Sequence, residues 1–122
     1  MLFAPTILMS SSADPDLMPL PMSLQRETGV FRLTPGFRVG FATGQDDRLT
    51  RAVSRTLRAW EERSGLEFSR NSSGDYLPAA NVASAGLVIE CAKDAAEFPQ
   101  LGEDESYTLI VTPEQVRLRA AT

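Results

Sequence analysis

The chain has 122 residues, 43% of them hydrophobic and 23% charged, which is the size and composition of one globular domain. Its net charge of −4 argues against nucleic acid as the main partner, because such affinity comes largely from neutralisation of phosphates by Lys and Arg. The sequence contains no histidine, which removes the commonest general base, the Ser-His and Cys-His nucleophile pairs and most zinc sites. The single cysteine, Cys91, excludes an internal disulfide.

The N-terminal residues are mostly apolar and run into a serine-rich segment. No Lys or Arg precedes the apolar run and Pro5 interrupts it, so two features of a secretory signal peptide are missing. Two interpretations of residues 1–16 stay open, a disordered leader or the remnant of a signal. The run is far too short to span a bilayer. The folded domain is predicted to occupy residues 17–122.

Two short strands are predicted before the first helix. Leu17 to Met22 contains two prolines, which favour extended backbone along the domain surface. The first strand is predicted over Val30 to Leu33. The second is predicted over Phe37 to Ala42, where alternate apolar side chains share one face.

One long amphipathic helix is predicted from about Arg48 to Ser64, with Asp46 or Asp47 as its N-cap and Gly65 at its C′ position. Its apolar stripe follows steps of four, four and three residues: Leu49, Val53, Leu57 and Trp60. A place in this stripe favours core packing of Trp60 over a sugar-stacking platform. The charged residues of the helix favour a solvated face over a partner-binding patch, because acidic residues elsewhere more than balance its arginines.

Two further strands are predicted at Leu66 to Phe68 and at Leu87 to Cys91, with a loop over 70–86 between them. Within this loop, Asn71-Ser72-Ser73 fits a glycosylation sequon, a pattern that is common by chance. Cys91 is predicted to be a small packed residue and not a reactive thiol, since no histidine is present to pair with it.

The last part of the sequence is predicted to form an antiparallel hairpin. Tyr107 to Thr112 and Val116 to Arg119 both show the two-residue period of a strand, and the break around Pro113 supplies a turn. The arginines of the second strand are expected to face water. The predicted buried face consists of Leu109, Val111, Val116 and Leu118.

Three pieces of the chain resemble, in the same order, the N-terminal domain of β-N-acetylhexosaminidases of glycoside hydrolase family 20. The segments that resemble the hairpin closing that domain are Gly102 to Val111 and Val116 to Ala120. The segments that resemble its opening are Leu17 to Pro21, Gly29 to Leu33 and Phe37 to Val39. Leu87 to Glu90 stands where the family has a strand before its Glu-Ser-Tyr motif. The resemblance covers about residues 17–122.

The resemblance implies the non-catalytic N-terminal domain of a bacterial β-N-acetylhexosaminidase, which supports a catalytic barrel that is absent from these residues. The whole enzyme, here called the parent enzyme, would remove terminal β-linked N-acetylhexosamine and would contact its glycan through residues outside this chain. A periplasmic or secreted location is favoured. In the family, the substrate's acetamido oxygen attacks the anomeric carbon, assisted by an Asp-Glu pair in the barrel. No position of this chain matches that pair, so no catalytic residue is carried over.

Glycoside hydrolysis needs carboxylates, and the chain has three acidic clusters: Asp46-Asp47, Glu61-Glu62 and Glu103-Asp104-Glu105. Neighbouring side chains diverge by about 100° on a helix and point to opposite faces on a strand, so adjacency does not make a working pair. Capping and solvated turns are the favoured interpretation of all three clusters. The sequence shows no phosphate-binding Gly-rich loop and no metal-ligand spacing, so no catalytic residue, metal or cofactor is predicted.

The overall prediction is an α+β domain with a mostly antiparallel sheet of about five or six strands and one long amphipathic helix on one face. One helix cannot cover such a sheet, so exposed apolar surface and self-association through it are expected. Other functions stay open. The chain could be a stand-alone module that binds carbohydrate or protein, or the N-terminal domain of another carbohydrate-active enzyme, such as an α-glucuronidase or an O-linked N-acetylglucosaminidase.

Overall fold

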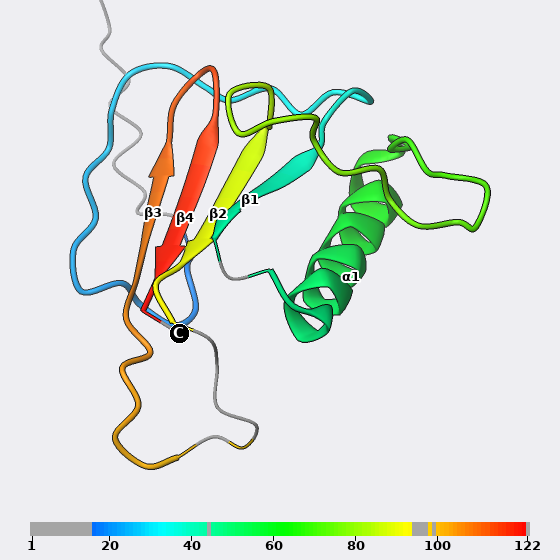
Figure 1. The fold of residues 1–122 in the computed structure, drawn as a ribbon. Coiled ribbons are helices and arrows are strands. Elements are labelled where there is room, and N and C mark those ends of the chain that lie inside the picture. The colour runs from blue at the N-terminus through cyan, green and yellow to red at the C-terminus, as the bar shows by residue number, and fades with distance from the viewer. Residues whose placement is uncertain (1–15, 44, 94–97, 99, 122) are drawn as a thin grey trace, which may run out of the picture.

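The computed structural model describes residues 16–43, 45–93, 98 and 100–121 (Figure 1). The elements in chain order are β1 (Val39–Thr43), α1 (Asp47–Ser64), β2 (Leu87–Cys91), β3 (Tyr107–Val111) and β4 (Val116–Ala120). The leader predicted over residues 1–16 lies outside the described residues, except for Asp16. Among the described residues, no helix is long and apolar enough to cross a membrane.

The four strands form one mixed sheet in the order β1-β2-β4-β3. β2 pairs in parallel with both β1 and β4, and only β3 and β4 are antiparallel. The α+β class with one helix is confirmed, whereas the prediction of a mostly antiparallel sheet of five or six strands is wrong. The helix between β1 and β2 returns the chain to the end where β1 began, which makes that pair parallel.

Two of the predicted strands do not exist. Val30 to Leu33 and Leu66 to Phe68 are irregular segments, and Phe68 is nevertheless buried. Phe31, Leu33 and Leu66 also pack against the core from these segments. The prediction failed because alternation of apolar residues reports which side chains are buried, and a segment can bury them without joining a hydrogen-bonded ladder.

The helix agrees closely with its prediction. α1 covers Asp47–Ser64, and Asp46 is its N-cap, where a side-chain oxygen accepts a hydrogen bond from the Leu49 amide at 2.7 Å. At the other end Gly65 has φ 73°, and its amide donates to the Glu61 carbonyl at 2.9 Å. Glycine adopts this left-handed conformation without steric cost, which explains why the helix ends there.

The core lies between α1 and the β1–β2 half of the sheet, the side on which Figure 1 shows the helix. Phe37, immediately before β1, is 6% exposed and contacts three aromatic rings. Its ring centroid lies 5.9 Å from that of Phe31 and 5.7 Å from those of Trp60 and Phe68. The other residues of the buried cluster are Val39, Leu57, Phe68 and Ile89. Sequentially distant segments therefore meet around one aromatic residue.

The predicted terminal hairpin is confirmed, but the prediction that one of its faces is buried is wrong for β3. β3 and β4 pair with Val111 opposite Val116 and Leu109 opposite Leu118. Leu109 and Val111 are 54% and 52% exposed, because β3 is the edge strand farthest from α1 (Figure 1). Val116 and Leu118 are half-buried, and Leu118 packs against the core. This face of the sheet is therefore uncovered at β3, whereas β4 is partly covered.

Candidate functional site

The three acidic clusters lie at separate places in the fold. Asp46 and Asp47 are at the first turn of α1, whereas Glu61 and Glu62 are in its last turns. Fifteen residues of helix correspond to about 22 Å along the axis between Asp46 and Glu61. The paired carboxylates of glycosidases stand roughly 5–9.5 Å apart, so these two clusters cannot form such a pair.

The third cluster precedes β3. A carboxylate oxygen of Asp104 accepts a hydrogen bond from the Ser106 amide at 3.0 Å. Hydrogen bonds from Ser106 lower the pKa of Asp104, which keeps this carboxylate ionised. Glu105 is exposed. The Asp104 carboxylate therefore stabilises its own turn and has no proton to donate at neutral pH. Both properties agree with the interpretation of this cluster as a solvated turn.

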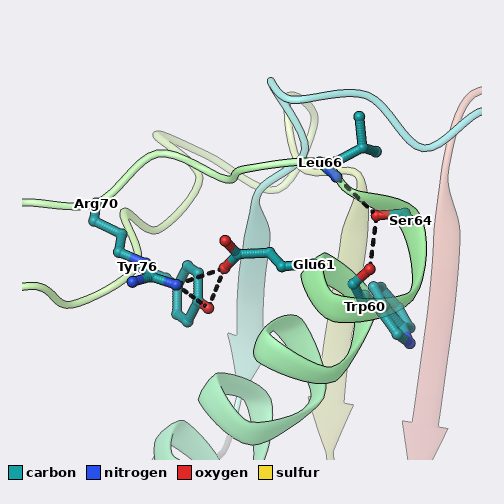
Figure 2. Close-up of polar contacts among 6 residues, drawn as sticks. All are labelled: Trp60, Glu61, Ser64, Leu66, Arg70 and Tyr76. Carbon is teal, nitrogen blue, oxygen red and sulfur yellow. Dashed lines mark hydrogen bonds and ion pairs between the residues drawn. The ribbon is translucent and has the colours of Figure 1, made fainter.

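Glu61 belongs to a polar cluster that the sequence did not indicate (Figure 2). Arg70 donates from Nη2 to Glu61 Oε1 at 2.7 Å and to the Tyr76 hydroxyl at 2.6 Å. The Tyr76 hydroxyl in turn donates to Glu61 Oε1. The Arg70 guanidinium carbon also lies 4.5 Å from the centre of the Tyr76 ring. The three side chains form a closed ring of contacts between α1 and the loop that follows it.

The electrostatics of this cluster favour a structural role. The Tyr76 hydroxyl and Arg70 together lower the pKa of Glu61, and Glu61 and Tyr76 raise the pKa of Arg70. Burial and the carboxylate of Glu61 raise the pKa of the Tyr76 hydroxyl. Each group is therefore held in its ordinary charge state at neutral pH. A general acid or base needs the opposite shift, toward the working pH.

The cluster fastens a small hairpin to the helix. Arg70 and Tyr76 form an isolated antiparallel bridge, and the Asn71 amide donates to the Asp75 carbonyl at 2.8 Å. The sequence placed Arg70 at the start of a loop and Glu61 beside a solvated helix face. The only signal in the sequence for this cluster was a basic residue and a tyrosine six positions apart, on either side of a segment with Asn and Gly. Neither residue type identifies its partner on a helix nine or more positions earlier.

The helix end beside this cluster is closed by Ser64 (Figure 2). Its hydroxyl donates to the Trp60 carbonyl at 2.6 Å and accepts from the Leu66 amide at 3.2 Å. Trp60 packs against the core, with its ring edge-on to Phe37, as its position in the apolar stripe predicted. It also lines an apolar hollow of about 340 Å³ together with Phe31, Leu33 and Arg63.

Cys91 lies at the end of β2 and is half-buried. Burial, with a smaller effect of the Asp46 carboxylate, raises the pKa of its thiol. A raised pKa reduces the thiolate fraction on which nucleophilic reactivity depends. This environment favours the packed residue that the sequence suggested. In the part of the chain that the structure describes, no three His, Cys, Asp or Glu residues are grouped to hold a metal ion.

No protein-family model matches the chain, and no curated protein matches it. Among solved structures, the chain is similar to the crystal structure of a chitobiase from Flavobacterium johnsoniae (FjGH20). The two are 32% identical with a TM-score of 0.73, and the match covers 86% of this chain. It covers only 15% of the chitobiase chain, so the chain spans a small part of the length of that enzyme. The likeness is to one part of a glycoside hydrolase.

Proposed function

We propose that the chain is the non-catalytic N-terminal domain of a bacterial β-N-acetylhexosaminidase of glycoside hydrolase family 20. Its function is to support a catalytic barrel that removes terminal β-linked N-acetylhexosamine from glycans. The observation that carries this proposal is the match to 15% of a chitobiase by 86% of this chain at 32% identity. A chain that matches so small a share of an enzyme fits an accessory domain better than the whole enzyme.

The exposed apolar surface supports the same proposal. Tyr107, Leu109 and Val111 are 55%, 54% and 52% exposed on the sheet face beside α1. Among the described residues, more large apolar side chains are exposed than buried. Large exposed apolar patches mark interaction surfaces in soluble proteins. A domain that packs against the rest of a larger enzyme needs such a surface.

A domain exchange tests the proposal. The segment of the Flavobacterium johnsoniae chitobiase that corresponds to this chain is replaced by residues 17–122, and hydrolysis of 4-nitrophenyl N-acetyl-β-D-glucosaminide is measured. We expect a soluble and active chimera, whereas the same chitobiase without any such segment should unfold at a lower temperature. A chimera that is no more stable than the shortened chitobiase would contradict a supporting role.

Assays on the isolated chain distinguish this proposal from the alternative of a stand-alone binding module. We expect no hydrolysis of the same substrate and no heat of binding when chito-oligosaccharides are titrated into the isolated chain. Hydrolysis would overturn the assignment as a non-catalytic domain. Binding at millimolar concentrations or tighter would favour the module, because a supporting domain contacts its glycan only through the parent enzyme.

A further inference from the structure

The outer face of α1 carries a row of arginines. They follow one another at steps of three, four and three residues: Arg48, Arg51, Arg55 and Arg58. At 3.6 residues per turn, these steps keep the four side chains within about 80° of the helix circumference and spread them over about 15 Å of its axis. The row lies opposite the apolar stripe that packs against the core, so it points away from the sheet (Figure 1).

The arginine row is exposed and has no partner in the domain. All four residues are exposed, and no hydrogen bond or ion pair connects any of them to a described residue. Arg70 and Arg119 differ, since they pair with the carboxylates of Glu61 and Glu90. The chain has 16 acidic residues against 12 basic ones, so the charge of the row is balanced in the total but not by any neighbour within reach.

This arrangement costs the helix stability. Arg51 and Arg55 are four positions apart, and each has a further arginine three positions away, at spacings where like charges on a helix repel. A face that meets only water is more stable when acidic and basic residues alternate at these spacings. Natural sequences break such local rules mainly where a function requires it. A row of one sign therefore points to a partner that supplies the opposite charge.

Acidic residues limit the row at both ends. Asp47 directly precedes Arg48, and Glu62 follows Arg58 by about one turn. A long polyanion or an anionic membrane would extend past the four arginines and meet these two carboxylates on a chain whose net charge is −4. The apolar stripe of α1 is packed against the core, so the helix has no apolar face to insert between lipids. The row matches a short acidic segment better than either of these surfaces.

We infer that the arginine row of α1 binds an acidic helix of a partner protein. Carboxylates spaced three and four residues apart on one face of a helix have the same rise along the axis as the arginines of the row. Each guanidinium can then form a charge-assisted, bidentate contact with one carboxylate. Basic residues beyond the ends of the acidic segment would match Asp47 and Glu62. The proposal stands on the charge pattern of α1 and does not depend on the proposed function.

Two synthetic peptides test the inference. The first presents four glutamates on one helix face at steps of three, four and three residues, with a lysine one turn beyond each end. The second has the same composition, with its glutamates spread around the helix. Calorimetric titration into the full chain should show binding of the first peptide that weakens with added salt, and binding of the second should be at least about tenfold weaker. No binding of the first peptide at millimolar concentration, or equal binding of the two, would overturn the proposal.

Matched variants locate the binding on α1. A chain carrying both Arg51→Glu and Arg55→Glu should bind the first peptide at least about tenfold more weakly, because two attractions become repulsions. The control carries Arg32→Glu and Lys93→Glu, which change the net charge equally at exposed positions outside α1, and it should bind within about twofold of the wild type. Circular dichroism verifies that both variants are folded. Equal weakening in the two variants would assign the binding to net charge and refute the row.

The unbound chain gives an independent readout. Arg55→Gln removes the repulsion from Arg51 and Arg58, so it should raise the midpoint of thermal unfolding by about 2–4 °C at low salt while it weakens binding of the first peptide. A lower midpoint would show that Arg55 has a favourable contact within the domain and would contradict the proposal.

Two other probes distinguish the class of partner. Heparin and mixed phosphatidylcholine–phosphatidylserine vesicles are titrated into the same chain, and both should bind more weakly than the first peptide. Tighter binding of either probe, lost in the chain with Arg51→Glu and Arg55→Glu, would replace the acidic helix by a polyanionic glycan or a membrane surface and refute the proposal.

Discussion

The ring of Phe37 occupies the space that a side chain at position 86 would need. A Cβ atom built on Gly86 would lie 2.5 Å from Phe37 Cδ2, well inside van der Waals contact. Gly86 cannot easily move away, because its amide donates to the Arg38 carbonyl at 2.9 Å and its carbonyl accepts from the Val116 amide at 2.8 Å. This contact joins the central aromatic residue of the core to the start of β2.

Gly86→Ala should therefore destabilise the domain by about 1–3 kcal/mol, the usual cost of overpacking a core. The matched control is Gly36→Ala, since a Cβ there meets only Thr34 Oγ1 at 3.9 Å. Urea unfolding followed by circular dichroism measures both variants. Equal stability of the two would show that the ring of Phe37 can move aside.

The N-cap of α1 is the second test. Asp46→Ala removes the acceptor of the Leu49 amide and should lower the free energy of unfolding by about 1 kcal/mol. Asp47→Ala removes an acidic residue from the same first turn without removing that hydrogen bond. We expect Asp47→Ala to cost less, a few tenths of a kcal/mol at low salt. A larger loss of stability for Asp47→Ala than for Asp46→Ala would contradict the assignment of Asp46 as the N-cap.

Burial differs sharply between two leucines of the domain. Leu57 on α1 is 4% exposed, whereas Leu109 on β3 is 54% exposed. Leu57→Ala should cost about 2–5 kcal/mol, because it opens a cavity in the core. Leu109→Ala should change the stability of the monomer by only about 0.5 kcal/mol. Both are measured by urea unfolding at a protein concentration low enough to keep the chain monomeric. Similar losses of stability for the two substitutions would contradict the finding that the side chain of Leu109 is exposed on an uncovered part of the sheet.

The cluster of Glu61, Arg70 and Tyr76 predicts a specific dependence of stability on pH. The folded state lowers the pKa of Glu61 below its ordinary value of 4.5, chiefly through the hydrogen bond from Tyr76. Its contribution to stability is therefore present above pH 4.5 and is lost as pH falls through the folded pKa. Glu61→Gln should be less stable than the wild type at pH 7, and the difference should shrink in acid.

Thermal unfolding of both proteins between pH 3 and pH 7 measures this difference. Glu62→Gln is the control, because Glu62 is the exposed neighbour of Glu61 on the same helix. It should leave the pH profile close to that of the wild type. A constant difference between Glu61→Gln and the wild type at every pH would mean that the charge of Glu61 contributes nothing.

Local patterns predicted the single elements well. The limits of α1 came within one residue because its cap, its apolar stripe and its terminal glycine all lie within or beside the helix. β2 and the β3–β4 hairpin were also found where strand periodicity placed them. The same periodicity wrongly predicted strands around Phe31 and Phe68, whose side chains pack against or within the core from irregular backbone.

The residues of the polar cluster could not be predicted as a group. Glu61 and Arg70 are nine positions apart, and Tyr76 lies on the far side of a small hairpin. Their meeting depends on how that hairpin folds back onto α1, which no pattern in either segment specifies. Likewise, the pairing of β2 with β4 brings together segments more than twenty positions apart.

The sequence by itself determined that one capped helix, a buried strand and a terminal hairpin would form, because caps, turns and periodicity act between near neighbours in the chain. Only the tertiary structure decided that β2 lies parallel to both its neighbours and that α1 stands over one half of the sheet. It also decided that Leu109 and Val111 face solvent, whereas Leu118 on the paired strand packs against the core. These outcomes depend on which distant segments share surface, and alternation along one strand is the same whether or not another element covers it.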